Sequence, residues 1–173
     1  MSGTGRPDAG PVDASGLRLE IVATRWNGGI TDTLVDRAVA AAKASGIESL
    51  SVFRVAGAVE LPVVAAALAA RSDAVACLGA VIRGGTPHFE YVCEAVTYGL
   101  ARVALDTGTP IGNGVLTCDT VDQAVERCGG PGSKEDKGWE AVIAALDAAL
   151  VLRAVREGTR GGADSLPERL RFQ

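Results

Sequence analysis

Two patterns of hydrophobic and polar positions alternate along this chain. Short runs rich in Val, Ile and Leu are typical of strands, whereas apolar residues recurring three, four and seven positions apart are typical of one helix face. Runs of the first kind predict strands at residues 17–24, 49–55, 74–82 and 110–117. The remaining segments between and after them predict helices at residues 30–45, 62–71, 87–105, 120–127 and 138–156.

The alternation of strands with helices predicts the fold class. Residues 74–82 are apolar at nearly every position, as in a strand buried on both faces at the centre of a parallel sheet. Right-handed crossovers would place helices on both faces. We therefore predict a doubly wound, flavodoxin-like α/β sandwich of three layers, with a four-stranded, mainly parallel sheet. Residues 17–156 form the predicted single domain, between a flexible leader (1–16) and a flexible tail (157–173).

Composition and charge narrow the class of protein. Apolar residues make up 47% of the chain and the net charge is −4, which excludes a disordered chain and favours neither nucleic acid nor membrane as a partner. No apolar run reaches the roughly 18 residues that span a bilayer, and no signal-peptide core is present, so we expect a cytoplasmic protein. The four cysteines form no CxxC pair, which favours reduced, buried thiols over a metal site.

Ligands of open parallel sheets bind beyond the carboxyl ends of the strands, and the most informative segment follows the third strand. It reads Arg83-Gly84-Gly85-Thr86-Pro87-His88. The glycines permit unusual backbone conformations and close approach of a ligand, Thr86 suits a helix N-cap, and Pro87 suits the first helical position. Because a helix N-terminus attracts anions, this turn predicts a phosphate site. An ordinary glycine-rich turn without a ligand is the alternative.

His88 is the only histidine of the chain and falls in the first turn of the same predicted helix. The helix dipole disfavours the imidazolium there, so the neutral ring is suited to general acid/base catalysis near pH 7. A surface histidine without a role is the alternative.

Further candidates carry two interpretations each. Trp26, followed by Asn27, suits either core packing or a platform for a heterocycle. Glu60 suits either a helix cap or an acceptor for polyol hydroxyls. Arg127 and Lys137 both suit solvated surface charges, and Arg127 alternatively suits a clamp for phosphate. Neither a GxGxxG or GxxxxGK[ST] loop nor a GxSxG elbow is present, which disfavours nicotinamide, ATP and serine-hydrolase chemistry.

Taken together, these motifs resemble the lumazine synthase family over residues 17–156. The segments that carry the resemblance are 57–62 (GAVELP), 81–92 (VIRGGTPHFEYV), 110–117 (PIGNGVLT) and 135–138 (EDKG). The resemblance implies condensation of 5-amino-6-(D-ribitylamino)uracil with 3,4-dihydroxy-2-butanone 4-phosphate, giving 6,7-dimethyl-8-ribityllumazine, phosphate and water. It implies no metal and no cofactor.

The resemblance also implies roles for single residues. His88 moves protons, Gly85 and Thr86 bind phosphate through backbone N–H groups, and Arg127 clamps the phosphate. The pyrimidine and its ribityl chain are bound by Trp26, Asn27, Ala58, Val59, Glu60, Val81, Ile82, Asn113 and Lys137. Gly85 stands where the family usually has a larger residue, which is tolerable for a backbone contact.

An active site between adjacent subunits is a further implication, so that Arg127 serves a neighbour's pocket. The loop 127–137 is longer than in members that form icosahedral shells and lacks their Gly-Thr-Lys-Ala-Gly-like run, which implies a homopentamer rather than a sixty-subunit capsid. Two alternatives remain: an archaeal-type riboflavin synthase, which has no phosphorylated substrate, and a non-catalytic flavin- or lumazine-binding relative.

Overall fold

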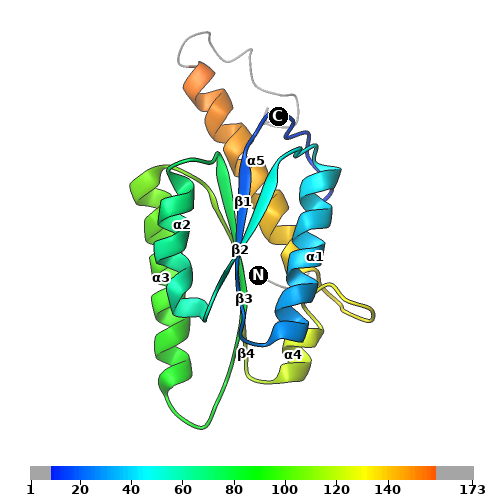
Figure 1. Ribbon diagram of the computed structural model, residues 1–173, viewed down its shortest axis with the longest axis vertical. Coiled ribbons are helices and arrows are strands. Elements are labelled where there is room, and N and C mark those ends of the chain that lie inside the picture. The colour runs from blue at the N-terminus through cyan, green and yellow to red at the C-terminus, as the bar shows by residue number, and fades with distance from the viewer. Residues whose placement is uncertain (1–8, 159–173) are drawn as a thin grey trace, which may run out of the picture.

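The computed structural model describes residues 9–158, which form three layers (Figure 1). All three pairs of neighbouring strands in the central sheet are parallel, and the strand order is β2-β1-β3-β4. The predicted doubly wound α/β sandwich is confirmed, with a sheet that is parallel throughout. The strands are β1 (Leu19–Thr24), β2 (Leu50–Val55), β3 (Ala74–Ile82) and β4 (Ile111–Cys118).

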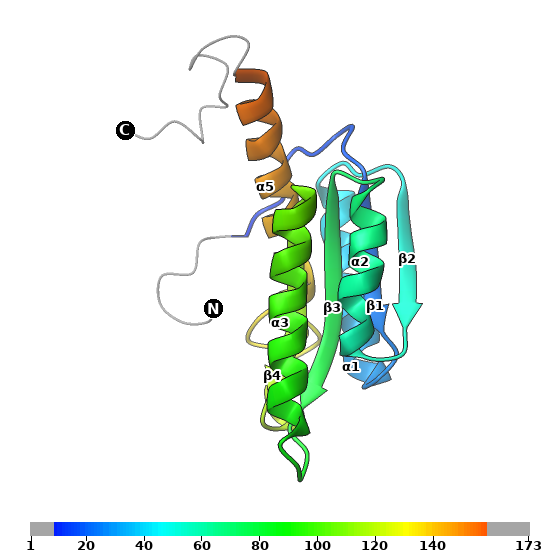
Figure 2. The ribbon, with the colours of Figure 1, turned by 90° about the vertical axis from the view of Figure 1, so that its left-hand side faces the viewer.

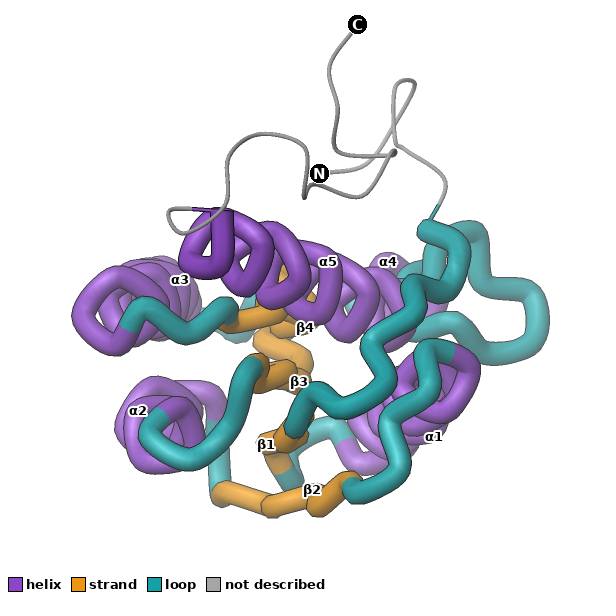
Figure 3. The backbone as a smooth tube through the Cα atoms, turned by 90° about the horizontal axis from the view of Figure 1, so that it is seen from above, coloured by secondary structure: helices purple, strands orange, loops and turns teal. Residues whose placement is uncertain are grey.

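The helices cover both faces of the sheet, as the view from above shows (Figure 3). One core cluster lies between the sheet and the layer of α1 and α5, and a smaller one lies between the sheet and α2 with α3. A short 3-10 turn, η1 (Ala58–Glu60), which the sequence did not predict, precedes α2. The helices are α1 (Gly28–Ala44), α2 (Leu61–Ala69), α3 (His88–Thr107), α4 (Val121–Val125) and α5 (Lys137–Gly158).

The strand order reverses between β1 and β3, and this reversal positions the candidate site. The chain moves from β1 outward to β2, then crosses to the other side of β1 for β3 and β4. Figure 2 shows the arrowheads of β2 and β3 at the same end of the sheet. A crevice between the carboxyl ends of diverging strands is where doubly wound sheets bind ligands. Here that crevice is bordered by the segments that follow β1 and β3.

Part of the predicted flexible leader packs on the domain. Ala14 is fully buried, and its N–H donates to the Ser45 carbonyl at 2.9 Å. The Trp139 indole Nε1 donates to the Ala9 carbonyl at 2.6 Å, which holds residue 9 against α5. The rest of the predicted leader (1–8), and the predicted tail beyond residue 158, lie outside the described residues. None of the helices in the described range 9–158 is long and apolar enough to span a membrane.

The layer of α1 and α5 packs so closely that it requires glycine at two positions. A Cβ atom on Gly112 of β4 would lie 2.1 Å from the Ala141 carbonyl oxygen of α5. A Cβ atom on Gly138 of α5 would lie 2.3 Å from the Leu34 carbonyl oxygen of α1. Both contacts are with backbone atoms, so a side chain at either position would push whole elements apart.

Gly112→Ala is therefore expected to destabilise the fold by about 1–3 kcal/mol, because overpacking at a backbone contact cannot be relieved by rotating a side chain. Gly85→Ala is the matched control: a Cβ there would meet nothing within 4 Å, and the φ angle of Gly85 is not positive. Its stability should stay within about 0.5 kcal/mol of wild type. Thermal unfolding at one protein concentration measures both. Equal melting temperatures for the two variants would contradict the close packing.

Candidate active site

The loop after β1 is fastened to β3 by Asn27. Its backbone is left-handed (φ 57°, ψ 48°), a conformation that asparagine tolerates better than most residues. Its side-chain Nδ2 donates to the Ala80 carbonyl of β3 at 2.9 Å. The Asn27 amide thus holds the two sides of the crevice together and leaves Oδ1 for other contacts.

Trp26 precedes Asn27 and presents its ring at the crevice. The residue is 71% exposed, so core packing does not explain it. Its ring lies over Gly57, where a Cβ atom would be 3.6 Å from Trp26 Cδ1. The exposed ring is suited to stacking against a flat heterocycle.

The segment after β2 adds an acidic group beside this ring. Glu60 Oε2 accepts a hydrogen bond from the Gly57 N–H at 2.8 Å, which caps η1. The Glu60 side chain is exposed, so its other oxygen remains accessible. Ala58 is buried, and Val59 is half exposed. Any contact of Ala58 with a ligand would therefore be through its backbone.

Val81 and Ile82 end β3 and point to opposite faces of the sheet, as successive strand residues do. Val81 packs with the cluster under α2 and α3, and Ile82 packs with the cluster under α1 and α5. Of these two side chains, only that of Val81 therefore lies on the face of the sheet that carries α3 and His88.

The turn from Gly84 to His88 is exposed at every residue. Helix α3 has 20 residues and begins at His88, with Pro87 as its N-cap and no side chain capping its N-terminus. The prediction that Thr86 caps this helix is wrong, because the chain enters the helix one residue later. The predicted special backbone of Gly84 and Gly85 is also wrong, since neither has a positive φ. What the glycines provide is open space, because a Cβ on either would meet nothing within 4 Å.

Arg83, at the base of this turn, makes contacts that the sequence analysis missed. Its Nη1 donates to Glu90 Oε1 in the first turn of α3, and its Nε donates to Asp119 Oδ1 after β4 at 2.6 Å. Hydrogen bonds to Asp119 and Glu90 raise the pKa of Arg83, and the bond from Arg83 lowers the pKa of Glu90. The sequence contained a signal for this contact. The neighbouring parallel strands β3 and β4 end side by side, so Arg83 and Asp119, which directly follow them, lie close together.

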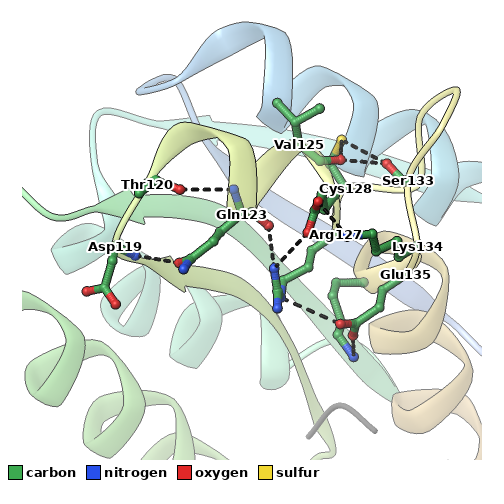
Figure 4. Close-up of polar contacts among 11 residues, drawn as sticks. Asp119, Thr120, Gln123, Val125, Arg127, Cys128, Ser133, Lys134 and Glu135 are labelled. Carbon is green, nitrogen blue, oxygen red and sulfur yellow. Dashed lines mark hydrogen bonds and ion pairs between the residues drawn. The ribbon is translucent and has the colours of Figure 1, made fainter.

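Figure 1 shows α1, α4 and α5 on the other face of the sheet from α3. Lys137 is the first residue of α5 and Arg127 comes two residues after α4, whereas His88 is the first residue of α3. Figure 4 shows the Arg127 guanidinium held between the Gln123 carbonyl, at 2.8 Å, and Glu135, at 3.5 Å. Within the described chain, Arg127 Nη2 has no hydrogen-bond partner. The arginine is therefore oriented by the protein and retains donors for an anion.

Lys137 opens α5 beside this arginine. Its Nζ lies 2.7 Å from Glu135 and 2.7 Å from Glu140. Burial opposes the charged ammonium, but the hydrogen bonds to the two carboxylates outweigh it and raise the pKa of Lys137. This lysine stays protonated at neutral pH, and Glu135 links it to Arg127.

Asn113 lies apart from both groups. It is the third residue of β4, exposed, and its Oδ1 accepts a hydrogen bond from the Val115 N–H at 3.0 Å. It pairs in register with Cys77, four residues before the Val81–Thr117 pair. Both strands end one residue further on, at the Ile82–Cys118 pair, so at about 3.3 Å per residue Asn113 is roughly 17 Å from the carboxyl edge. A single chain does not bring Asn113 to the turn that carries His88.

Two open cavities adjoin the domain. The larger, about 450 Å³, lies between the first turn of α1 and residues 125–133 and is bordered by Asn27. The smaller, about 210 Å³, lies at the opposite end of the sheet, beside Arg153 and Arg156. Neither is lined by Trp26 or His88, so the groups with the clearest chemistry lie on an open surface of the single chain.

The fold and this site define a class of protein. A flavodoxin-like sheet carries at its switch point an exposed aromatic ring, an uncapped helix N-terminus and a histidine, the features of an enzyme acting on a small anionic substrate. The 6,7-dimethyl-8-ribityllumazine synthase family model matches residues 16–153, and the chain belongs to this family. The resemblance predicted from the sequence is confirmed.

Curated relatives match along nearly their whole length. A 6,7-dimethyl-8-ribityllumazine synthase from Thermobifida fusca (strain YX) is 59% identical over 167 residues, which cover 96% of this chain and 97% of the relative. The enzyme of the same name from Frankia casuarinae is 62% identical over 154 residues, covering 88% and 96%. That from Saccharopolyspora erythraea is 59% identical over 163 residues, covering 93% and 99%.

Proposed function

We propose that this protein is a cytoplasmic transferase of riboflavin biosynthesis. It condenses 5-amino-6-(D-ribitylamino)uracil with 3,4-dihydroxy-2-butanone 4-phosphate to 6,7-dimethyl-8-ribityllumazine, releasing phosphate and water. The observation that carries the proposal, beside the family, is the uncapped N-terminus of α3 with His88 as its first residue, at the switch-point crevice. Such a terminus binds phosphate through its N–H groups and its partial positive charge.

The first half of the proposed site lies on the face of the sheet that carries α2 and α3. Trp26 stacks on the pyrimidine, and Glu60 accepts hydroxyls of the ribityl chain with the oxygen that does not cap η1. Gly85 and Thr86 donate backbone N–H groups to the phosphate. Asn27, Ala58, Val59 and Val81 line the pyrimidine and ribityl side of the same crevice. Ile82, whose side chain points to the other face, borders the crevice through its backbone.

The second half comes from a neighbouring subunit. Arg83, the cation nearest the turn in sequence, already faces two carboxylates, so the phosphate needs a cation from elsewhere. Arg127 is oriented and has donors to spare, but within its own chain it lies on the opposite face of the sheet. Asn113 and Lys137 join Arg127 in serving the neighbour's pocket.

A stripe on α3 supports assembly into a homo-oligomer. Tyr91, Tyr98 and Leu105 follow one another at intervals of seven residues and are 69%, 66% and 84% exposed. Residues seven apart lie on one side of a helix, so these three form one apolar seam. Exposed apolar patches of this kind mark protein contacts. A homopentamer is the proposed assembly.

The chemistry needs no covalent enzyme group and no cofactor, because the attacking amine and the accepting ketone both belong to substrates. Holding them in an attack geometry supplies much of the acceleration. His88 transfers protons as the imine forms, the phosphate leaves and the ring closes. Phosphate is the leaving group, which explains an anion site beside the acid/base residue.

Mixing the purified protein with the two substrates and following lumazine absorbance tests the proposal. Formation above the spontaneous rate is the expected result, and no formation would overturn it. Turnover of lumazine alone would identify a riboflavin synthase, and binding of lumazine without turnover would identify a non-catalytic relative. Sedimentation equilibrium separates a pentamer from a sixty-subunit shell by mass.

A further inference from the structure

The turn from Gly84 to His88 is fixed at its base by an ion pair between Arg83, which precedes it, and Glu90, which lies two residues after it. We propose that Arg83 is a positioning residue that holds this turn in the shape that binds phosphate and presents His88. The inference deepens the proposed function and rests on it. Arg83 reaches across the turn to Glu90 and sideways to Asp119, which follows β4.

Arg83 is attached to three elements at once. Its N–H donates to the Cys118 carbonyl of β4 at 3.0 Å, extending the sheet by one residue. Its guanidinium lies 4.2 Å from the centre of the Phe89 ring in α3, within the range of a cation–π contact. The side chain thus joins the end of β3, the end of β4 and the first turn of α3.

The turn itself has few other restraints. Within the described chain, the side chains of Thr86 and His88 form no hydrogen bond, and both glycines have open space around them. The one backbone bond at the turn runs from the Glu90 N–H to the Pro87 carbonyl at 3.2 Å. The positions of the phosphate-binding N–H groups and of His88 therefore depend on how the two ends are held.

Arg83 acts through the turn, and the phosphate is not its ligand. Its Nε and Nη1 are both engaged by carboxylates, and its pairing with Glu90 keeps that carboxylate charged, with a lowered pKa. Both carboxylates are in direct hydrogen-bond contact with the Arg83 guanidinium, whereas the two carboxylates nearest Arg127 lie at 3.5 Å and 4.0 Å. The Arg83 cluster therefore carries a net negative charge at its donors and does not attract a phosphate. These contacts are suited to holding the ends of the turn in place, and we call the ion pairs of Arg83 with Glu90 and Asp119 the brace.

The brace is too exposed to matter for global stability. Arg83, Glu90 and Asp119 have side chains that are 41%, 54% and 60% exposed, and such ion pairs contribute little to folding. Breaking them should shift the melting temperature by no more than about 4 °C. Catalysis is more sensitive, because a displacement of about 1 Å in a reacting group can cost roughly 100-fold in rate.

Four single variants test the brace. Arg83→Gln and Glu90→Gln each break the contact across the turn, and Arg83→Lys keeps the charge with less reach. Arg18→Gln is the matched control, because it breaks an exposed ion pair with Asp73, 68% and 36% exposed, at the other end of the sheet from the turn. Steady-state kinetics with each substrate varied, and titration with inorganic phosphate, are the measurements.

Arg83→Gln and Glu90→Gln are each expected to raise KM for the butanone phosphate about tenfold, which corresponds to the loss of one charge-assisted contact. The dissociation constant for inorganic phosphate should rise by about the same factor. KM for the pyrimidine should stay within twofold, which a general loss of structure would not produce. Arg83→Lys should recover part of the loss. In the double variant, the two effects should not multiply, because both break one contact.

A KM for the butanone phosphate within twofold of wild type in both Arg83→Gln and Glu90→Gln would overturn the inference, as would equal losses in Arg18→Gln. If wild type forms no lumazine, the proposed function fails, and the phosphate titration still decides: unchanged binding in both Gln variants overturns the brace. If Arg83→Gln does not fold, Glu90→Gln and Arg83→Lys decide by the same criteria.

Discussion

His88→Ala is expected to lower kcat about 100-fold while leaving the affinity for inorganic phosphate within twofold of wild type. General acid/base groups contribute roughly 10²–10⁴-fold, and the lower end applies because the substrates supply both nucleophile and electrophile. In the proposed site, phosphate is bound by backbone N–H groups at the start of α3, and alanine at position 88 retains these groups. Because the imidazole is exposed and makes no hydrogen bond within the described chain, its removal leaves no buried group unsatisfied.

The measurement is the initial rate of lumazine formation, beside a titration with inorganic phosphate. The loss of rate in His88→Ala should persist at saturating concentrations of both substrates, because the variant removes proton transfer and not substrate binding. His88→Gln, which keeps a polar group without the acid/base function, should behave as His88→Ala does. Loss of phosphate binding in both variants would instead assign His88 a structural role in the turn.

The fold was predictable because its signals are local. The uninterrupted apolar run at 74–82 is a consequence of burial on both faces, and β3 spans those residues. The segments that follow strands were predictable as the site for the same reason, since the carboxyl ends of parallel strands share one edge. The family resemblance added residues, such as Val81 and Ile82, that no local pattern singles out.

The features that the sequence could not predict are those set by the layer in which a side chain lies. Val81 and Ile82 are neighbours in sequence, yet the pleat sends them to opposite faces. Arg83 and Asp119 are 36 positions apart, and only the pairing of β3 with β4 brings them together. The N-cap at Pro87 rather than Thr86 is a shift of one residue, the scale at which helix ends escape sequence patterns.

Because His88 and Arg127 belong to different layers, oligomers that contain both single variants can test whether the site lies between subunits. Arg127→Ala alone is expected to raise KM for the butanone phosphate about 10- to 150-fold, the value of a charge-assisted contact. His88→Ala alone should impair kcat. His88 begins α3 and Arg127 follows α4, and these helices lie on opposite faces of the sheet. In the proposed site, one residue therefore comes from each of two subunits. A mixed oligomer then contains some sites that combine the intact His88 of the Arg127→Ala variant with the intact Arg127 of the His88→Ala variant.

Unfolding the two variants together at equal amounts and refolding them should restore about a quarter of wild-type activity, since a quarter of random pairings combine both intact halves. The rate is measured with the butanone phosphate well below its wild-type KM, where a site without Arg127 contributes little. If both residues served the same chain's site, no pairing would be intact and the mixture would only average its parents. A mixture of wild type with the double variant His88→Ala/Arg127→Ala is the matched control. It should retain about a quarter of the activity for a site between subunits and about half for a site within one chain, because only the first requires two wild-type neighbours.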